Sequence, residues 1–298
     1  MRAIERLQTK DYRILLPISN PATVASLVIP AIAIARKNNA EVILLHVIEV
    51  EHHMPLLAGA QSNREVEEIL DTAQGLLNKA GIPSQPFIRV SHRISRAIVE
   101  TAIDEECNFI ILGRQKNPSI LERLYSSVID SVVQNSPCEV AVLHGDLSGV
   151  SVKNVLIPYA ENIHSHLALQ IAPAFTDFFK STARVRIVFE SDISDGVRKN
   201  QTDILQKRLH RSKLDATLEI ISNQEIVRGV VQGAQSADLL IMGARSGYFF
   251  EILFGQSTAK EITERVKCPV LWVVEYEERP SFLASLVKPL NVEIGEPR

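Results

Sequence analysis

Three apolar segments occur once in each half of this chain of 298 residues. They are YRILLP at 12–17 and KNVLIP at 153–158, CNFIILG at 107–113 and ADLLIMG at 237–243, and PCEVAVL at 137–143 and KCPVLWV at 267–273. The offset between the copies is 141 residues for the first pair and 130 for the other two, so the first copy has about eleven more residues in its middle. A repeat on this scale predicts one structural unit that is present twice.

Helical patterns alternate with these segments. Apolar residues at 23–37 recur at spacings of three and four, the pattern of an amphipathic helix, and EVILLHV at 41–47 is a continuous apolar run typical of a buried strand. A helix at 62–80, a strand at 87–90 and a helix at 94–105 follow, and the second half repeats this order. The alternation predicts an α/β fold of two tandem doubly wound, Rossmann-like domains, each with a five-stranded parallel sheet.

The length agrees with two domains and is enough for two separate cores. HGDLSGV at 144–150 has the glycines, aspartate and serine of a linker, so we place the first domain at 1–149 and the second at 150–278. Residues 279–298 form a C-terminal tail with one apolar patch at 282–287 between two prolines. The sequence leaves open whether this tail docks or is disordered.

Composition and motifs exclude several classes of protein. The net charge of −3 provides no basic field for nucleic acid, and an odd count of three cysteines fits a reducing compartment, so we expect a soluble, cytoplasmic protein. The most apolar stretch, 22–35, is shorter than the roughly 18 to 20 residues of a membrane span. The sequence contains no phosphate-loop motif and no nucleophile elbow. We expect no metal site and no catalytic residue, although Glu251 leaves weak ATP hydrolysis open.

Ligands bind open parallel sheets at the carboxyl ends of the strands. In the second half, the loop that follows 237–243 contains glycines that let backbone amides approach a ligand, and small polar residues begin the next helix, whose N-terminus attracts anions. Arg245 would neutralise phosphate charge, and Pro158 with Met242 would wall the base or ribose. The candidate nucleotide-binding residues of this half are Pro158, Met242, Gly243, Arg245, Ser246, Gly247, Gly255, Gln256, Ser257 and Thr258.

The corresponding loop of the first half suits phosphate less well. It keeps Gly113 but has Lys116 where a second glycine would lie. Either Arg114 and Lys116 supply charge in place of glycines, or the loop has lost its ligand. The candidate residues of this half are Pro17, Ser19, Val47, Gly113, Lys116, Ser126 and Ser127.

These loops and the strand order resemble the universal stress protein family over about residues 13–275, which implies the adenine nucleotide alpha hydrolase-like variant of the fold. Family members that bind ATP carry glycine, two residues, glycine, nine residues, then glycine with serine or threonine. Gly243 and Gly255 match this pattern with one residue fewer between them, whereas the first half matches at Gly113 and Ser127. The resemblance implies an adenine nucleotide (ATP, ADP or AMP) or a cyclic dinucleotide as ligand, with or without Mg²⁺.

The family also places an aspartate just after the first strand, near the nucleotide. Ser19 occupies that position in the first half and Ala160 occupies it in the second. Both halves therefore depart from the family at a residue that contacts the ligand.

The segment at 7–24 resembles the one that joins membrane transporters of the amino acid/polyamine/cation type to cytoplasmic universal stress protein tails. The chain would then be the regulatory end of a permease or a free-standing relative. Its closing strands, at 140–143 and 270–274, are apolar on both faces, and an uncovered strand edge invites pairing. We expect these strands to pair within one chain as an intramolecular pseudo-dimer, with a homodimer as the other arrangement.

The predicted function is non-catalytic nucleotide sensing in a regulatory or stress-response protein, with a nucleotide ligand and a membrane transporter as the partners. The alternative is a scaffold without a ligand that acts through protein association. It would use the closing strands, the aromatic residues at 248–250 or the tail.

Overall fold

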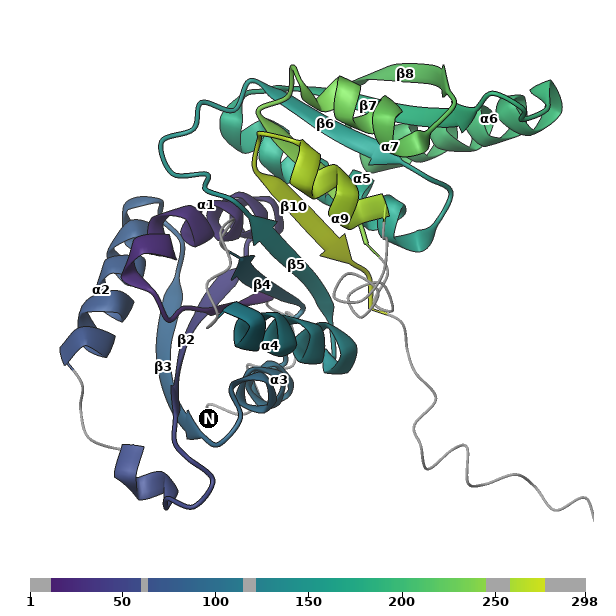
Figure 1. The fold of residues 1–298 in the computed structure, drawn as a ribbon. Helices are drawn as coiled ribbons and strands as arrows, with labels where there is room; N and C mark the ends of the chain where they lie inside the picture. The colour runs from purple at the N-terminus through teal and green to yellow at the C-terminus, as the bar shows by residue number, and fades with distance from the viewer. Residues whose placement is uncertain (1–11, 60–63, 115–121, 245–257, 277–298) are drawn as a thin grey trace, which may run out of the picture.

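The computed structural model describes residues 12–59, 64–114, 122–244 and 258–276, with the backbone alone at 58–59 and 122–127 (Figure 1). The elements of the first half are β1 (Arg13–Pro17), α1 (Pro21–Asn38), β2 (Glu41–Glu49), the short 3-10 helix η2 (Leu56–Gly59), α2 (Arg64–Lys79), β3 (Ser84–Ser91), α3 (Ile94–Asp104), β4 (Phe109–Arg114), α4 (Glu122–Asn135) and β5 (Glu139–His144). Those of the second half are β6 (Asn154–Tyr159), α5 (Ile163–Phe179), β7 (Thr182–Glu190), α6 (Asp195–Ser212), β8 (Ala216–Asn223), α7 (Ile226–Ala234), β9 (Leu239–Gly243), α9 (Thr258–Arg265) and β10 (Val270–Val274).

The strands of this described part form one ten-stranded sheet in the order β3-β2-β1-β4-β5-β10-β9-β6-β7-β8. Within each half the five strands are parallel, which confirms the predicted α/β fold. β5 and β10 meet antiparallel at the centre, with Val142 opposite Trp272 and Ala141 opposite Val273. The closing strands of the two halves therefore pair with each other inside one chain.

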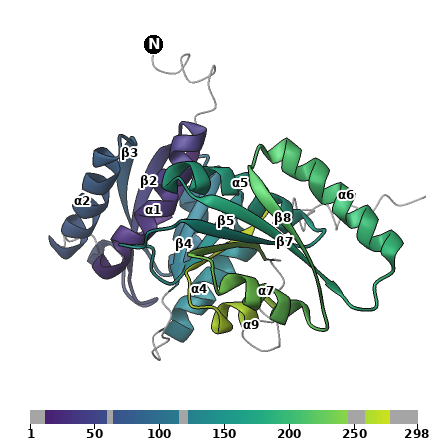
Figure 2. The ribbon, with the colours of Figure 1, turned by 90° about the horizontal axis from the view of Figure 1, so that it is seen from above.

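Helices cover both faces of this sheet (Figures 1 and 2). α1, α2, α5 and α6 pack on one face, and α3, α4, α7 and α9 pack on the other. Alternate side chains of β1 pack on opposite faces of the sheet, since Ile14 and Leu16 belong to one buried cluster and Leu15 to the other. This double burial explains why the strands are continuous apolar runs.

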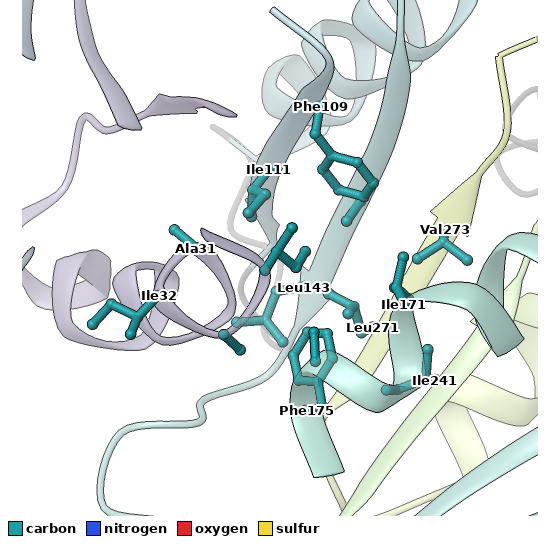
Figure 3. Close-up of a cluster of buried hydrophobic side chains, with 14 of the residues drawn as sticks. Ala31, Ile32, Phe109, Ile111, Leu143, Ile171, Phe175, Ile241, Leu271 and Val273 are labelled. Carbon is teal, nitrogen blue, oxygen red and sulfur yellow. The ribbon is translucent and has the colours of Figure 1, made fainter. Parts of the chain in front are cut away.

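The hydrophobic core crosses from one half to the other. α1 packs against α5, and a single buried cluster contains residues from both halves. Figure 3 shows Phe175 of α5 next to Leu143 and Leu271 of the two central strands, with Ile32 of α1 farther to the left. The length would be enough for two separate cores, but the pairing of β5 with β10 and the packing of α1 against α5 join buried residues of the two halves in one cluster.

Similar caps begin the first helix of each half. The Asn20 side chain accepts a hydrogen bond from the Ala22 amide at 2.9 Å, and the Asn162 side chain accepts one from the Ser165 amide at the same distance. Each helix therefore starts close to the end of the preceding strand. Between the halves, β5 ends at His144 and β6 begins at Asn154, so the boundary that we place near Gly149 falls in their connection. The tail at 279–298 lies outside the described residues.

Candidate functional site

A cavity of about 450 Å³ lies at the carboxyl ends of β6, β7 and β9 in the second half. β6 and β9 are neighbours in the sheet, yet the helix that follows β6 packs on one face and the helix that precedes β10 packs on the other. Open α/β sheets bind ligands at such a divergence of crossovers. The volume lies within the range of roughly 300–1,000 Å³ that is typical of small-molecule sites.

The structure brings four of the predicted second-half residues to this cavity. Pro158 at the end of β6, Met242 and Gly243 at the end of β9, and Thr258 at the start of α9 all line it. The other predicted residues of this half lie outside the described part of the chain: Arg245, Ser246, Gly247, Gly255, Gln256 and Ser257.

Gly243 has a packing role that the loop pattern did not indicate. A Cβ atom added at this position would lie 2.3 Å from the carbonyl carbon of His164 and 2.4 Å from the Ser165 nitrogen. Those atoms belong to the first turn of α5, so only glycine lets this turn approach the end of β9. The close approach places the start of α5 directly beside the cavity.

The connection from β6 to α5 lines the cavity with polar groups held in place. The Ala160 amide donates to the Ser165 hydroxyl at 3.3 Å, while the Ser165 amide donates to the Asn162 side chain. Ala160 itself is exposed and stands where the resembled family has its aspartate. Position 160 has no carboxylate, but the next residue in the chain has one.

Glu161 supplies that carboxylate, and its neighbours hold it in the ionised form. The Tyr159 hydroxyl donates to Oε2, and Arg208 Nη2 donates to Oε1 at 2.8 Å. His166 Nε2 lies 3.3 Å from Oε1. Burial acts to raise the pKa of Glu161, but the bonds from Tyr159 and Arg208 outweigh it and lower the pKa below its ordinary value. Sequence reasoning missed this residue because it inspected the family's position alone and not the next one.

A buried arginine forms another part of the wall. Arg186 of β7 is 9% exposed and lines the cavity, while its Nε donates to Glu219 Oε2 at 2.6 Å and its Nη1 donates to the Gly229 carbonyl at 2.8 Å. Arg184 Nη1 donates to the other oxygen of Glu219 at 3.0 Å. Sequence reasoning missed Arg186 as well, although two arginines among the apolar residues of one strand were the available signal.

The first half has a smaller cavity of about 290 Å³ in a different place. It lies between the start of α1, the ends of β4 and β5, and Asp146 of the connection, and Gly113 lines it. A Cβ atom added to Gly113 would lie 2.7 Å from Leu27 Cδ2, so the Leu27 side chain occupies the space beside the end of β4. Gly113 is therefore packed against α1, as Gly243 is packed against α5.

The remaining first-half candidates are not brought together around this cavity. Pro17, Ser19 and Val47 are described but do not line it. Lys116 lies outside the described residues, and Ser126 and Ser127 fall within α4, where the structure describes the backbone alone.

Comparison with known proteins relates this fold to one family. Residues 12–144 match the model of the universal stress protein family. The chain is 29% identical over 154 residues to the Na(+)/H(+) antiporter NhaS5 of Synechocystis sp., a match that covers 51% of this chain and 22% of the antiporter. The chain thus spans about a fifth of the length of this curated relative. No helix among the described residues is both long enough and apolar enough to cross a membrane.

Solved structures share the architecture across both halves. One is a universal stress protein from Archaeoglobus fulgidus DSM 4304, with 18% identity, a TM-score of 0.56 and coverage of 87% of this chain and 95% of that one. Another is the cytoplasmic domain of a prokaryotic cation chloride cotransporter, with 14% identity, a TM-score of 0.58 and coverage of 89% and 96%. At these identities the likeness concerns the fold. Residues 12–144 therefore match the universal stress protein family, and the second half of the chain repeats their fold.

Proposed function

We propose that this protein is a non-catalytic regulatory protein that binds a nucleotide in the cavity of its second half. The observation that carries the proposal is the position of this cavity, at the point where the crossovers after β6 and β9 diverge. In the first half, Pro17 and Val47 do not line the cavity described there, which lies instead between the start of α1 and the ends of β4 and β5. The two halves would then differ in function.

The proposed ligand is an adenine nucleotide, ATP, ADP or AMP, or a cyclic dinucleotide, with or without Mg²⁺. Pro158 and Met242 would wall the base or ribose, and the ionised Glu161 would accept hydrogen bonds from ribose hydroxyls. Thr258 lies at the N-terminus of α9, where backbone N–H groups favour a phosphate. In the preceding loop, the glycines would let backbone amides approach the phosphates, and Arg245 would neutralise their charge.

Calorimetry with a matched pair of blocked variants tests the site. Ala160 and Ser19 occupy equivalent exposed positions after the first strand of each half. Ala160→Phe would fill the mouth of the second cavity, and we expect it to abolish heat of binding for ATP, AMP and cyclic di-AMP at near-millimolar concentration. Ser19→Phe places the same bulk in the first half and should leave binding unchanged. Absence of heat with the unmodified protein for all three ligands would sink the proposal.

We further propose that the partner is a membrane transporter. The support is the match to a portion of an antiporter and the resemblance of residues 7–24 to a transporter junction. One chain would act as an intramolecular pseudo-dimer, because the closing strand that could pair with a second copy already pairs with its own repeat. Transport by a membrane protein encoded with this chain, assayed in vesicles with wild type and with Ala160→Phe, is expected to differ. Equal transport would argue against regulation by the ligand.

The second candidate is a scaffold without a ligand. The observation that favours it is the loss of the family's aspartate in both halves, at Ser19 and Ala160. Light scattering distinguishes the scaffold from the nucleotide sensor. A scaffold should associate with itself or with its partner to the same extent with and without nucleotide. Weak ATP hydrolysis, the remaining alternative, would appear as phosphate release above that of buffer.

A further inference from the structure

The inner wall of the second-half cavity carries a fixed positive charge at a strand position where the first half has leucine. We propose that Arg186 recognises the base of the bound nucleotide, by donating a hydrogen bond from its guanidinium to an acceptor atom of the base. The inference rests on the proposed function, since it names the part of the ligand that this wall contacts. It makes Arg186 a specificity-determining residue.

The guanidinium is held in one orientation with donors to spare. Its Nε and Nη1 are engaged by Glu219 and by the Gly229 carbonyl, which come from β8 and α7. Among the described residues, no partner accepts a hydrogen bond from Nη2, although the side chain lines the cavity. Because the guanidinium is planar and two of its nitrogens are bonded, Nη2 is already oriented. A ligand that bonds to Nη2 therefore causes a smaller loss of side-chain entropy.

The wall offers donors from this cluster, because Arg186 lines the cavity and Glu219 does not. Both oxygens of Glu219 are already bonded, one by Arg186 at 2.6 Å and one by Arg184 at 3.0 Å. Burial acts to raise the pKa of Glu219, but the bonds from the two arginines outweigh it and keep the carboxylate ionised. Two guanidinium groups share one carboxylate, so one positive charge remains in excess. An amino group of a ligand would meet like donors here, whereas a ring nitrogen or a carbonyl oxygen would be bonded.

Gly233 of α7 makes room for this arginine, and Gly229 makes room for the nearby Val188. A Cβ atom added at Gly233 would lie 2.5 Å from Arg186 Cζ, and one added at Gly229 would lie 2.6 Å from Val188 Cγ1. Any larger residue at position 233 would force the guanidinium to move. The arginine and the glycine therefore form one arrangement and not an isolated buried charge.

The first half has an apolar counterpart of the arginine. Strand register places Leu45 beside Pro17 as it places Arg186 beside Pro158, so Leu45 is the equivalent of the arginine. The positions that match Gly229 and Gly233, counted from the start of each helix, are occupied by Ala97 and Thr101. The charged wall is thus a property of the half that has the larger cavity.

The other residues beside Arg186 suit a flat ring. Val188, Val230 and Met242 line the same cavity and present apolar surface. Apolar faces combined with a single directional donor match a nucleobase, which has flat apolar faces and acceptors at its edge. A sugar or a phosphate would leave these apolar side chains against polar groups.

Titration of AMP, cyclic di-AMP and ribose 5-phosphate tests the inference with two arginine variants. Arg186→Leu introduces the residue of the first half, and we expect it to weaken AMP and cyclic di-AMP by about tenfold or more while ribose 5-phosphate binds as before. Arg184→Ile is the matched control, because Arg184 bonds the same carboxylate but does not line the cavity. It should leave the affinity for AMP within about threefold.

Deaza analogues of AMP identify the acceptor. The unmodified protein should bind one of 1-deaza-, 3-deaza- or 7-deaza-AMP about tenfold more weakly than AMP, and Arg186→Leu should bind that analogue and AMP equally. The inference is overturned if Arg186→Leu binds AMP as well as wild type does, if no analogue is discriminated, or if ribose 5-phosphate weakens to the same extent as AMP. If wild type binds none of the three ligands, the nucleotide site itself fails, which is a distinguishable result.

Discussion

In the first half Leu27 fills the space beside Gly113 at the end of β4, whereas in the second half the backbone of His164 and Ser165 lies beside Gly243. In the first half the strand next to β1 carries Leu45, whereas the equivalent position in the second half carries Arg186. The topology of the halves is the same, so these differences come from local helix packing and side-chain identity and not from the arrangement of strands. A duplicated fold can therefore place a buried charge at one strand position of the second half and an apolar side chain at the equivalent position of the first.

The antiparallel pairing of β5 and β10 joins the two halves. Breaking it should change the structure more than any other substitution proposed below. Val142 and Val273 are fully buried on opposite faces of the central strands. Replacing both with lysine buries two unpaired charges at a cost of at least several kcal/mol, on the order of the charge-burial penalty. We expect the halves to separate, which small-angle scattering would detect as an increased radius of gyration.

The matched control for this junction replaces the same two residues with alanine. That change removes packing without introducing charge and should lower stability while leaving the scattering curve nearly unchanged. A lysine variant as compact as wild type would mean that the strand pairing does not hold the halves together.

The glycines at the ends of β9 and β4 provide the next largest difference. An alanine Cβ at position 243 would meet backbone atoms of α5, which cannot move without shifting the helix, whereas at position 113 it would meet the side chain of Leu27. We expect Gly243→Ala to lower the free energy of unfolding by about 3 kcal/mol and Gly113→Ala by about 1 kcal/mol. Denaturant unfolding of the two variants measures both values. Equal losses would contradict the close approach of α5.

A double-mutant cycle at Arg186 and Gly233 should show coupling of about 2 kcal/mol. In the wild type, Gly233→Ala would crowd the guanidinium and destabilise the protein. In the Arg186→Leu background that crowding is absent, and the same change should be neutral or stabilising by roughly 0.5–1 kcal/mol because alanine favours a helix. Unfolding experiments on the four proteins give the coupling.

Gly196 of α6 serves as the control for this cycle. A Cβ atom added there would meet nothing within 4 Å. Gly196→Ala should therefore have the same small effect in the wild type and in the Arg186→Leu background. Additive effects of Arg186→Leu and Gly233→Ala would show that the two residues do not form one arrangement.

The fold could be predicted from sequence because the repeat and the apolar runs act locally along the chain. The segments that end at Pro17, Gly113, Pro158 and Gly243 became the central strands of each half, as their apolar character required. The shared core could not be predicted, because an amphipathic pattern shows that a helix such as α1 has a buried face but not which helix covers it.

The candidate site was only partly predictable for a related reason. Pro158, Met242 and Thr258 follow from the rule that ligands bind at strand ends, and they line the cavity. Arg186 and Gly233 are 47 positions apart, and their match becomes visible only when α7 is packed on β7. Glu161 lies one residue beyond the position that the family pattern indicates, and its importance depends on contacts with Arg208, which comes from α6.

The smallest expected effect concerns the opposite titration of one carboxyl group in each half. Asp130 of α4 is 5% exposed, and burial raises its pKa to about 6, although Arg114 acts to lower it. The folded state therefore holds this proton at pH values where the unfolded chain has released it, so the stabilisation is complete below about pH 4 and is lost as the pH rises through 6. Glu161 in the second half has a lowered pKa, so its contribution is lost as the pH falls.

Asp130→Asn and Glu161→Gln separate these contributions. Relative to Asp130→Asn, the wild type should lose about 1 kcal/mol of stability between pH 5 and pH 7, because only the wild type releases the buried proton in that range. Relative to Glu161→Gln, the wild type should instead lose stability on acidification below the ordinary range of a glutamate pKa. Denaturant unfolding at each pH measures both differences. If the stability of the wild type and of Asp130→Asn changed in parallel with pH, Asp130 would have the same pKa in the folded and the unfolded chain. The opposite pH dependence of Asp130 in the first half and Glu161 in the second would then be wrong.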